Sequence, residues 1–379
     1  MKKVAIIITR LTEGGASEIV RQLVIAGYSK YDFTLFAGTE GLSNELLKEF
    51  EQYLCVILLP QLVRNISPLK DLSAYFYLLK EFKSNKFDVV HTHTSKAGFI
   101  GRLAAAKAGI KNIIHTPHGT IYTPDNNIDG VPRGFGKRLI MYAEQYTGKK
   151  TTSLTTLSKH EKDICVNLSL SKKENTHVIS NGIDAERFNF TKKEKEKARK
   201  KLQIKENEIL LLSIGRMTSE KGHAVLVDVF RKTLDSNKQI KLIIVGEGAE
   251  KDRLEKENSD LIEKNLLIFT GLDKNIEKYL AAADIFILPS LYEGFGIAAV
   301  EAMATGLPVI VSNVGGLPEI VRDKIDGFFA EPGDSTDFSE KILQLLNSKE
   351  KRVKMGNNAR VRAKEYTLEK MYENYFNLY

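Results

Sequence analysis

The sequence predicts an α/β protein with two Rossmann-like domains, each built on a doubly wound parallel sheet. Short apolar runs alternate with helical patterns along the chain, which is typical of parallel strands covered by helices. The alternation is interrupted once, after the turn signal at residues 181–184, and then starts again. The length of 379 residues and a hydrophobic content of 42% suit two or three globular domains with sizeable cores.

The first half carries the strands and helices of one such domain. Residues 4–8 form a continuous apolar run, the mark of a strand buried on both faces. Further strands are predicted at residues 33–37, 55–59, 88–91, 113–116, 152–157 and 176–179. Helices are predicted at residues 17–28, 43–52, 69–83, 96–108, 136–147 and 159–168. Glycine and proline breaks predict a long loop at residues 122–136.

The second half repeats the pattern. Strands are predicted at residues 209–214, 241–245, 266–269, 285–288 and 309–311, and helices at 223–234, 250–258, 276–282, 297–304, 338–346 and 350–364. The mixed-charge run 191–205 predicts a solvated helix beside the linker. We expect domains at 1–181 and 182–364, with a C-terminal helix, 365–379, that crosses back to the first domain.

The charge and cysteine content of the chain limit the classes of molecule that it is expected to bind. A net charge of +8 fits nucleic acid, an anionic membrane surface or a phosphorylated substrate. Nucleic acid is not expected, because acids are interleaved with the bases of the charged run and no aromatics are available there for stacking. The two cysteines, Cys55 and Cys165, have no CxxC spacing and fit a reducing cytoplasm.

The N-terminus and the apolar runs predict no membrane span. The start MKKVAIIITR has too short an apolar segment for a signal peptide, so we interpret it as the first strand. No run approaches the length of a transmembrane helix, so membrane contact is expected to be peripheral. The predicted helix 69–83 mixes lysines with an apolar and aromatic stripe, which fits a core-facing helix or a membrane-surface helix.

The stretch 289–318 is the most informative part of the chain. The glycine loop 293–296 follows a predicted strand and leads into a predicted helix, whose N-terminus suits a phosphate. Glu293 precedes that helix and Glu301 lies inside it. A site that holds a phosphate between two carboxylates, each able to accept hydrogen bonds from hydroxyls, fits a nucleotide sugar. One alternative is that Glu293 and Glu301 form a carboxylate pair for acid–base hydrolysis. Another is that Glu301 makes a structural salt bridge.

A second candidate is the loop 213–222, which carries Arg216 and Lys221 after a buried strand. Together these cations can neutralise a diphosphate, although surface charges on such a loop are also common. Its position at the carboxyl end of a strand favours function. Gly14 and Gly15 can allow the backbone to approach a ligand closely, and they can equally form a plain tight turn. The absence of the GxGxxG fingerprint counts against a dehydrogenase.

Four of the seven histidines lie close together in the sequence, at positions 91, 93, 115 and 118. His91 and His93 share one face of a strand, but no carboxylate or cysteine joins them at a metal-ligand spacing, so no metal is predicted. His118 stands between a proline and a glycine at a strand end, where we predict a substrate contact. The other three histidines are predicted to be structural.

Residues 293–301, EGFGIAAVE, resemble the E-x₇-E signature of the retaining glycosyltransferases of family 4, which have the GT-B fold. The resemblance covers nearly the whole chain and includes, in order, TEGGASE, HTHTSKAG, HTPHG, VISNGIDAERF, SIGRMTSEKG and GLPVIVSNVGGLPEIV. It implies two Rossmann-like domains that face a deep cleft, with the nucleotide sugar on the C-terminal domain and the acceptor on the N-terminal domain.

The resemblance also implies a role for each candidate residue. Arg216 and Lys221 would hold the diphosphate, Glu301 the ribose hydroxyls and Glu293 the donor sugar. The backbone amides of Phe295, Gly296 and Ile297 would approach the sugar and the phosphate. His118 would lie near the reacting sugar carbon, and Gly15 would lie at the donor phosphate from across the cleft. Ser17 stands where many relatives have an acidic residue, which leaves the role of Glu18 open.

The resemblance implies a retaining hexosyl transfer from a nucleoside diphosphate sugar, expected to be a UDP-sugar, to a glycan, lipid-linked or phosphorylated acceptor. We expect the enzyme to act in the cytoplasm in cell-envelope polysaccharide synthesis, with peripheral contact at the anionic inner membrane. The resemblance also implies that neither a cofactor nor a metal is needed, because in most such enzymes the cations and the helix end neutralise the departing diphosphate. A nucleotide-sugar epimerase, a phosphorylase and a non-catalytic nucleotide-sugar-binding module are the alternatives.

Overall fold

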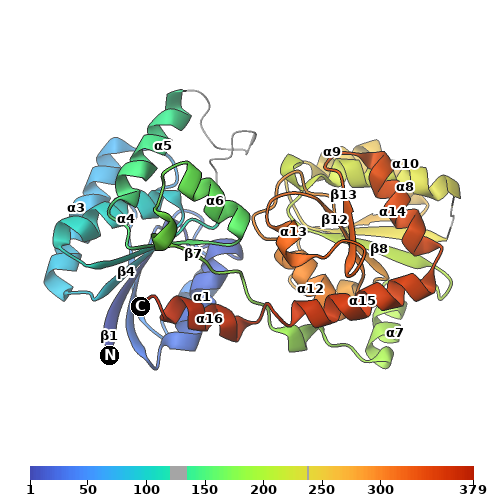
Figure 1. Cartoon of the computed structure of the whole chain (residues 1–379), viewed down its shortest axis with the longest axis horizontal. Helices are drawn as coiled ribbons and strands as arrows, with labels where there is room; N and C mark the ends of the chain where they lie inside the picture. Colours follow the sequence, from blue (N-terminus) through green and yellow to red (C-terminus); the bar gives the residue numbers. More distant parts are fainter. Residues whose placement is uncertain (120–134, 237–238) are drawn as a thin grey trace. The chain divides into compact units, whose positions relative to one another are not determined.

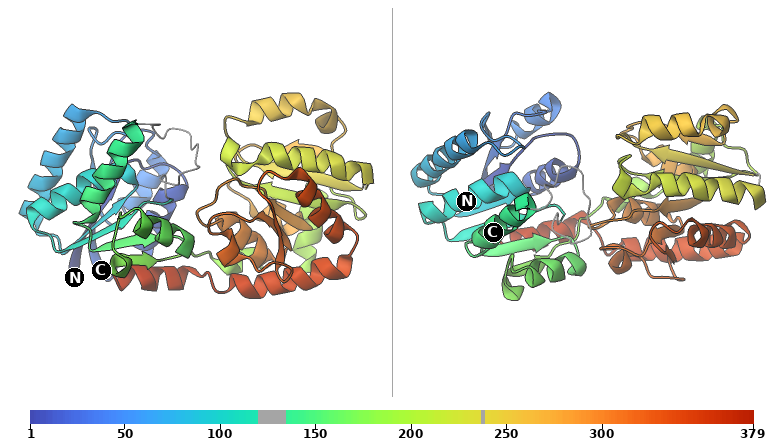
Figure 2. Two further views of the ribbon diagram at one scale, coloured as in Figure 1. Left: turned by 45° about the horizontal axis from the view of Figure 1, so that its top comes forward. Right: turned by 90° about the horizontal axis from the view of Figure 1, so that it is seen from above.

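The computed structural model describes residues 1–119, 135–236 and 239–379 (Figure 1). This part of the chain forms two compact units. Unit 1 contains Met1–Ser180 and Glu369–Tyr379, and unit 2 contains Asn181–Leu368. Each unit has a parallel sheet with helices on both faces (Figure 2). The predicted α/β class with two doubly wound parallel sheets is therefore confirmed.

The sheet of unit 1 has seven strands in the order β3-β2-β1-β4-β5-β6-β7. Their bounds are β1 (Lys2–Ile8), β2 (Tyr31–Ala37), β3 (Cys55–Leu58), β4 (Val89–His93), β5 (Asn112–Thr116), β6 (Ser153–Thr156) and β7 (Thr176–Val178). The helices are α1 (Gly15–Gly27), α2 (Asn44–Phe50), α3 (Pro68–Asn85), α4 (Ser95–Ala108), α5 (Phe135–Gly148), α6 (Lys159–Asn167) and α16 (Leu368–Phe376).

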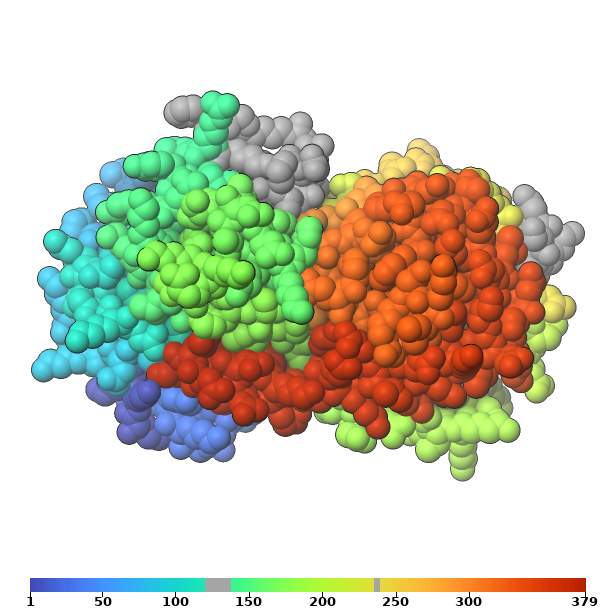
Figure 3. Space-filling view, in the orientation of Figure 1, coloured from blue at the N-terminus to red at the C-terminus, as the bar shows by residue number. Residues whose placement is uncertain are grey.

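Alternate residues of β1 enter different cores, as the pleat of a strand requires. Ala5 and Ile7 pack with α3 and α4 on one face of the sheet. Val4 and Ile6 pack with α1, α2 and Tyr379 on the other. Figure 3 shows α16, in dark red, seated against the blue N-terminal residues of unit 1. Both faces of this sheet are therefore buried, which explains the unbroken apolar run.

Helix α3 has an apolar stripe that enters the core of unit 1. Ala74, Leu78 and Phe82 are buried there. The core-facing interpretation of the predicted helix 69–83 is therefore correct for this stripe.

The sheet of unit 2 has six strands in the order β10-β9-β8-β11-β12-β13. Their bounds are β8 (Ile209–Ile214), β9 (Ile240–Val245), β10 (Leu267–Phe269), β11 (Ile285–Leu288), β12 (Val309–Ser312) and β13 (Gly327–Ala330). The helices are α7 (Lys192–Lys201), α8 (His223–Ser236), α9 (Lys251–Glu257), α10 (Ser259–Glu263), α11 (Glu277–Ala282), α12 (Ile297–Thr305), α13 (Leu317–Ile320), α14 (Ser335–Leu346) and α15 (Lys349–Ala363).

The charged run 191–205 forms α7, and Ala198 is the buried residue of this helix. Thr191 and Glu194 make a capping box at its start, which satisfies two donors of the first turn. The prediction of a solvated helix is confirmed.

The structure differs most from the predicted elements at β4, α10, α13 and β13. Strand β4 continues past His91 to His93. The short elements α13 and β13 were not predicted, and α10 follows the predicted helix 250–258 as a separate helix. Strand β13 escapes prediction because it begins with Gly327, a residue type that is depleted in strands. Glycine is needed there, since a Cβ would lie 1.8 Å from the carbonyl oxygen of Val309. Residues 122–134 of the predicted loop lie outside the described residues.

Each sheet has one point where the strand order reverses. In unit 1 this point lies between β1 and β4, and in unit 2 between β8 and β11. Ligands of open α/β sheets bind beyond the carboxyl ends of the strands at such points. No helix in the described part of the chain is both long and apolar enough to cross a bilayer.

Candidate active site

In unit 2, the loops that follow β8 and β11 are joined directly. The Leu291 amide donates to the carbonyl oxygen of Glu220 at 2.8 Å. Gly222 has a φ of +67°, and a Cβ there would lie 2.1 Å from the carbonyl oxygen of Pro289. Only glycine permits this close approach. The two loops at the reversal point of the sheet therefore form one surface.

A charge pair crosses the same junction. Lys221 Nζ donates to Glu293 Oε2 at 2.5 Å, and the two side chains are 17% and 13% exposed. Ser290 Oγ donates to the same carboxylate oxygen at 3.3 Å. Two of the predicted residues thus meet at the carboxyl edge of the sheet. Ser290 was missed in the sequence, although its place directly after a buried strand and a proline was a usable signal.

A third loop fixes the backbone of Glu293. The Gly316 amide donates to the Glu293 carbonyl oxygen at 3.0 Å. Gly315 has a φ of +55°, and a Cβ there would lie 1.9 Å from the same oxygen. Glu293 is therefore held from the loops after β8, β11 and β12, which preorganises its carboxylate.

Helix α12 begins directly beyond this carboxylate. Its N-cap, Gly296, has a φ of +94° and makes no side-chain cap. The first N–H groups of a helix have no intrahelical acceptor and carry partial positive charge, so this end suits an anion. The ring of Phe295 is 3% exposed and packs at 5.5 Å against the ring of Tyr366. At Phe295 the buried ring leaves the backbone amide as the group that a ligand can contact, whereas Ile297 in the first turn also exposes its side chain, at 39%.

Arg216 lies apart from the pair. Its side chain is 74% exposed, and its ion pair to Glu220 Oε1 is 3.3 Å long. Exposed pairs of this kind contribute little to stability because solvent screens them. The other oxygen of Glu220, Oε2, is buried and has no hydrogen-bond partner in the described part of the chain. The structure therefore brings Lys221 to Glu293 and leaves Arg216 at the edge.

Glu301 lies within α12 and is partly buried. Burial raises its pKa to about 8, and the charge of Arg187 partly opposes that effect. The guanidinium of Arg187 pairs instead with Glu277, with 2.5 Å between Nη2 and Oε1. Among the residues that the structure describes, Glu301 makes no ion pair, so the structural salt bridge is not found. Arg187 was missed in the sequence, because its proximity to Glu301 depends on the fold.

In unit 1, Gly15 is the first residue of α1 and has a φ of +54°. A Cβ placed on it would meet no atom within 4 Å, so its surface is open to close approach. Glu18 is held on the same helix by Arg21, with 2.7 Å between Oε1 and Nη2. Ser17 is buried and donates to the carbonyl oxygen of Arg10 at 3.3 Å. These contacts fix the side chains of Ser17 and Glu18 on α1.

His118 follows β5 with a φ of +59°, a conformation that non-glycine residues adopt rarely. Its Nε2 lies 2.8 Å from His93 Nδ1. Burial lowers the pKa of His118 to about 4, so the ring is neutral near pH 7. His91 is bound on both ring nitrogens, by Tyr379 Oη and Thr116 Oγ1 at 2.8 Å each. His91 is therefore structural, as predicted.

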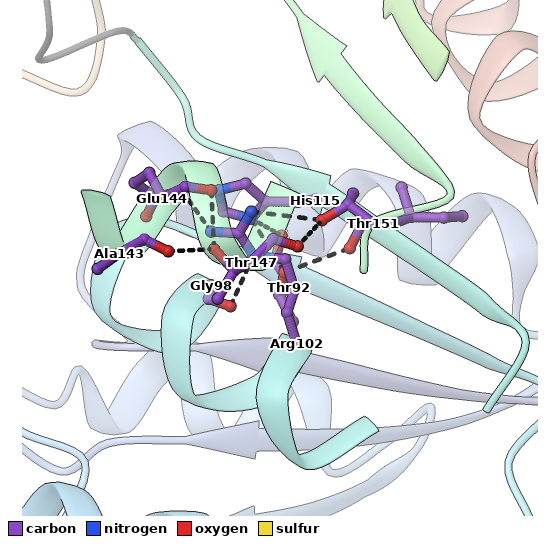
Figure 4. A network of polar contacts seen from close by, with 9 residues as sticks. Thr92, Gly98, Arg102, His115, Ala143, Glu144, Thr147 and Thr151 are labelled. Carbon is purple, nitrogen blue, oxygen red and sulfur yellow. Dashed lines mark hydrogen bonds and ion pairs between the residues drawn. The ribbon is translucent and has the colours of Figure 1, made fainter. Parts of the chain in front are cut away.

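His115 points to the opposite face of the sheet, into a buried polar network (Figure 4). Its Nδ1 lies 2.9 Å from Thr92 Oγ1. Beside it, Arg102 pairs with Glu144 of α5 and donates to the Gly98 carbonyl oxygen at 2.8 Å. His115 is thus structural too. In the described ranges, no three His, Cys, Asp or Glu side chains are grouped so as to hold a metal ion.

Comparison with known proteins identifies related families over both halves of the chain. Residues 14–187 match the family model described as Glycosyltransferase Family 4. Residues 194–362 match the model described as Glycosyl transferases group 1.

Two bacterial relatives illustrate the range of similarity. The first is the UDP-Gal:alpha-D-GlcNAc-diphosphoundecaprenol alpha-1,3-galactosyltransferase of Escherichia coli. It is 31% identical over 323 residues, which cover 84% of this chain and 81% of that protein. The second is the capsular polysaccharide biosynthesis glycosyltransferase CapM of Staphylococcus aureus. It is 27% identical, over 83% of this chain and 82% of that protein.

Solved structures share the fold. Anabaena Alr3699/HepE in complex with UDP and glucose superposes with a TM-score of 0.83 at 20% identity, over 100% of this chain and 99% of that one. The lipopolysaccharide glycosyltransferase WaaG superposes with a TM-score of 0.77, also at 20% identity, over 98% of each chain. These similarities identify the architecture as GT-B.

Proposed function

The chain belongs to glycosyltransferase family 4, and we propose that it transfers a hexose from a UDP-sugar to a hydroxyl of a lipid-linked glycan, with retention at the anomeric carbon. The proposal includes a place in cell-envelope polysaccharide synthesis. The observation that carries it is the pairing of Lys221 with Glu293 where the loops after β8 and β11 meet. There a cation, a carboxylate and a free helix N-terminus lie together.

These groups suit the departure of a diphosphate. As the bond between the anomeric carbon and the phosphate oxygen breaks, negative charge grows on that oxygen. Lys221 and the first amides of α12 would stabilise this charge from fixed positions. Glu293 would accept hydrogen bonds from the sugar, and Glu301 from the ribose diol. No step uses a metal.

In the proposed reaction, the acceptor hydroxyl attacks on the face that the diphosphate leaves. The new carbon–oxygen bond forms as the old one breaks, and the departing phosphate oxygen takes the hydroxyl proton. This route retains the configuration without a covalent enzyme intermediate. This route requires the protein to position the substrates and to stabilise the developing charge, and the groups around Glu293 can do both.

The choice of UDP and of a lipid-linked acceptor rests on relatives. The Escherichia coli protein is named for a UDP-galactose donor and a diphosphoundecaprenol-linked acceptor. The Anabaena structure contains UDP. A thermal-shift series with UDP, GDP and ADP tests the base, because a ligand that binds only the folded state raises its apparent stability. We expect the largest shift with UDP, and a larger shift with GDP would reject that choice.

We predict that Lys221→Met lowers kcat by about 100- to 1,000-fold, the usual cost of removing a donor that stabilises developing charge. Lys193→Met is the matched control, because Lys193 is exposed on α7. Transfer to a lipid-linked acceptor is measured, and melting curves check the fold. Near-normal turnover of a folded Lys221→Met protein would reject the assignment.

The same assay separates the alternatives. When the donor is incubated alone, a transferase leaves the sugar unchanged, whereas an epimerase isomerises it. A phosphorylase would instead cleave an oligosaccharide with inorganic phosphate. The coupling constant of the new anomeric proton gives the stereochemistry. An inverted product would contradict retention while leaving the transferase assignment intact.

We further propose that the protein works in the cytoplasm and contacts the anionic inner membrane through α3. Besides its buried stripe, this helix exposes a second apolar stripe, with Leu69 85% and Phe76 58% exposed and Leu72 between them. Lys70 and Lys80 lie exposed on the same helix. A helix with exposed apolar and basic side chains suits the surface of an anionic bilayer, where a lipid-linked acceptor would reside.

A further inference from the structure

Three histidine rings of unit 1 form a stack that ends at His118. The rings of His91 and His93, which share a face of β4, lie 4.0 Å apart. The rings of His93 and His118 lie 5.1 Å apart and are nearly parallel. His93 is completely buried between them. The base of the stack is fixed, because His91 is bound by Tyr379 and Thr116.

His93 and His118 also share one hydrogen bond, 2.8 Å long, between Nδ1 of the first and Nε2 of the second. Burial lowers the pKa of both rings below the usual histidine value, so both are neutral near pH 7. A neutral imidazole carries one hydrogen, on one of its two nitrogens. One ring must therefore donate and the other accept.

The direction of this bond follows from the other nitrogen of His93. Nε2 of His93 is buried and has no hydrogen-bond partner within the described residues. If His118 donated, His93 would carry its hydrogen on Nε2, as a buried donor without an acceptor. Such orphaned N–H groups are rare and costly. His93 therefore donates from Nδ1, and His118 accepts on Nε2.

We propose that His93 is a positioning residue that holds His118 in the Nδ1–H tautomer and presents that N–H as a hydrogen-bond donor. The position of the proton on one ring nitrogen is set by the bond that the other nitrogen makes. This inference rests on the proposed function for its consequence in catalysis, but not for the tautomer itself.

The backbone supports a fixed orientation. His118 keeps a φ of +59°, and the following Gly119 has a φ of +115°. Thr94, directly after His93, has φ +67° and ψ +162°, a region that is essentially restricted to glycine. Such strained residues persist only where the surrounding structure determines them, and they cluster at functional sites. One end of the hydrogen bond thus lies at the end of β4, next to the strained Thr94, and the other lies in the constrained turn after β5.

The tautomer defines what His118 can do. An imidazole whose Nε2 already accepts from His93 has no free lone pair with which to remove a proton. It presents Nδ1–H, which can donate to a sugar oxygen and fix the orientation of the ring. His118 would then orient the donor sugar, while the departing phosphate takes the proton of the acceptor hydroxyl.

Nitrogen NMR of the full chain, labelled with ¹⁵N-histidine, tests the tautomer directly. The seven histidines give few signals, and variants in which one histidine at a time is substituted assign each signal to its residue. The protonated and bare nitrogens of a neutral ring resonate far apart. We expect His118 to carry its hydrogen on Nδ1 in the unmodified protein. A spectrum with the hydrogen on Nε2 of His118 overturns the proposal.

Three variants then separate positioning from packing. His93→Phe keeps a ring and removes the donor, so His118 is expected to move toward the Nε2–H tautomer. His93→Asn can restore an N–H near the position of Nδ1 and is expected to keep Nδ1–H on His118. His160→Ala, on the exposed surface of α6, is the control. An unchanged His118 tautomer in a folded His93→Phe protein would also refute the proposal.

Kinetics with UDP-galactose supply a second readout. His93→Phe is expected to lower kcat by about 100-fold with the donor KM nearly unchanged, since small misplacements of a reacting group cost that much. His93→Asn should recover most of this loss, whereas a purely structural role predicts equal damage from both variants. If no UDP-sugar is turned over by the unmodified protein, the proposed function fails while the NMR result still decides the tautomer.

Discussion

Glu301 illustrates at the scale of one residue how the site is poised for binding. Its pKa is raised to about 8 by burial, so the carboxyl is mostly protonated at pH 7 in the free protein. The ionised carboxylate can accept from both hydroxyls of a ribose in charge-assisted hydrogen bonds, whereas the protonated carboxyl uses one oxygen as a donor and accepts more weakly. We therefore predict that UDP binding at pH 7 releases about one proton, and that affinity falls as the pH drops below 8.

Calorimetry in buffers of different ionisation enthalpy measures the released proton. The observed binding enthalpy should change linearly with the ionisation enthalpy of the buffer. Glu301→Gln should abolish this dependence and weaken UDP binding. A binding enthalpy that is the same in all buffers would show that Glu301 does not change its protonation state on binding.

The same residue should limit the stability of the fold. The folded pKa of about 8 lies above the value of about 4.3 for an unfolded glutamate, so the folded state holds the proton more tightly. The stability that this proton contributes is present below the unfolded pKa and is lost as the pH rises to 8. Glu301→Gln should therefore raise the melting temperature at pH 8.5 and have little effect at pH 4.

Melting curves across this range check the sign. Glu174→Gln is the control, because Glu174 is exposed in unit 1. A variant that stabilises the fold at high pH while it weakens UDP binding would show that burial of Glu301 is retained for function. Equal effects of Glu301→Gln at both pH values would contradict the raised pKa.

The sequence indicates some site residues better than others. Glu293, Lys221 and the glycines follow strands in sequence, so their position at the carboxyl edge could be predicted. Their direct ion pair could not, because it depends on Gly222 allowing one loop to touch the carbonyl of Pro289. The bond from His93 to His118 also depends on the pairing of β4 with β5, which brings together residues 25 positions apart.

At the scale of elements, the loop after β12 is expected to support catalysis without contacting substrate. A Cβ on Gly315 would lie 1.9 Å from the Glu293 carbonyl oxygen, which must shift. We predict that Gly315→Ala destabilises the protein by more than about 2 kcal/mol and lowers kcat/KM by about 100-fold, because Glu293 loses its preorganised position.

Gly109→Ala is a matched control for backbone strain. Gly109 has a φ of +83°, but a Cβ there would meet no atom within 4 Å. This variant should cost about 1–2 kcal/mol through its left-handed conformation alone and leave kcat/KM unchanged. Denaturant unfolding and initial rates separate the two effects. Equal loss of activity in both variants would mean that the contact with Glu293 is unimportant.

The sequence predicts strands made of consecutive large apolar residues more accurately than short segments that contain glycine or proline. The buried strands β8 and β11 have the predicted bounds, since continuous apolar runs mark strands covered on both faces. Strand β13 and helix α13 have four residues each and no periodic pattern. Their formation depends on the neighbouring β12 and on the loop around Gly316, and this tertiary context is not visible in a local segment.

At the scale of the whole molecule, the net charge of +8 and the exposed stripe of α3 favour binding to an anionic bilayer. Because the Debye length falls from about 30 Å at 0.01 M salt to about 10 Å at 0.1 M, attraction by charge alone should weaken steeply with salt. Apolar insertion through Leu72 and Phe76 is much less sensitive to salt. The two contributions can therefore be separated by substituting each kind of residue in the same helix.

We predict that the protein sediments with phosphatidylglycerol vesicles at low salt and not with neutral phosphatidylcholine vesicles. Lys70→Glu with Lys80→Glu should abolish binding to anionic vesicles, since each basic residue near the surface contributes about 1 kcal/mol. Leu72→Ser with Phe76→Ser should leave the weak electrostatic binding but remove the part that survives high salt. Lys193→Glu with Lys200→Glu, both at exposed positions of α7, lowers the net charge by the same amount and is the control. Failure to bind anionic vesicles at low salt would remove α3 as the membrane contact, because the electrostatic contribution is strongest there and the apolar contribution is also present.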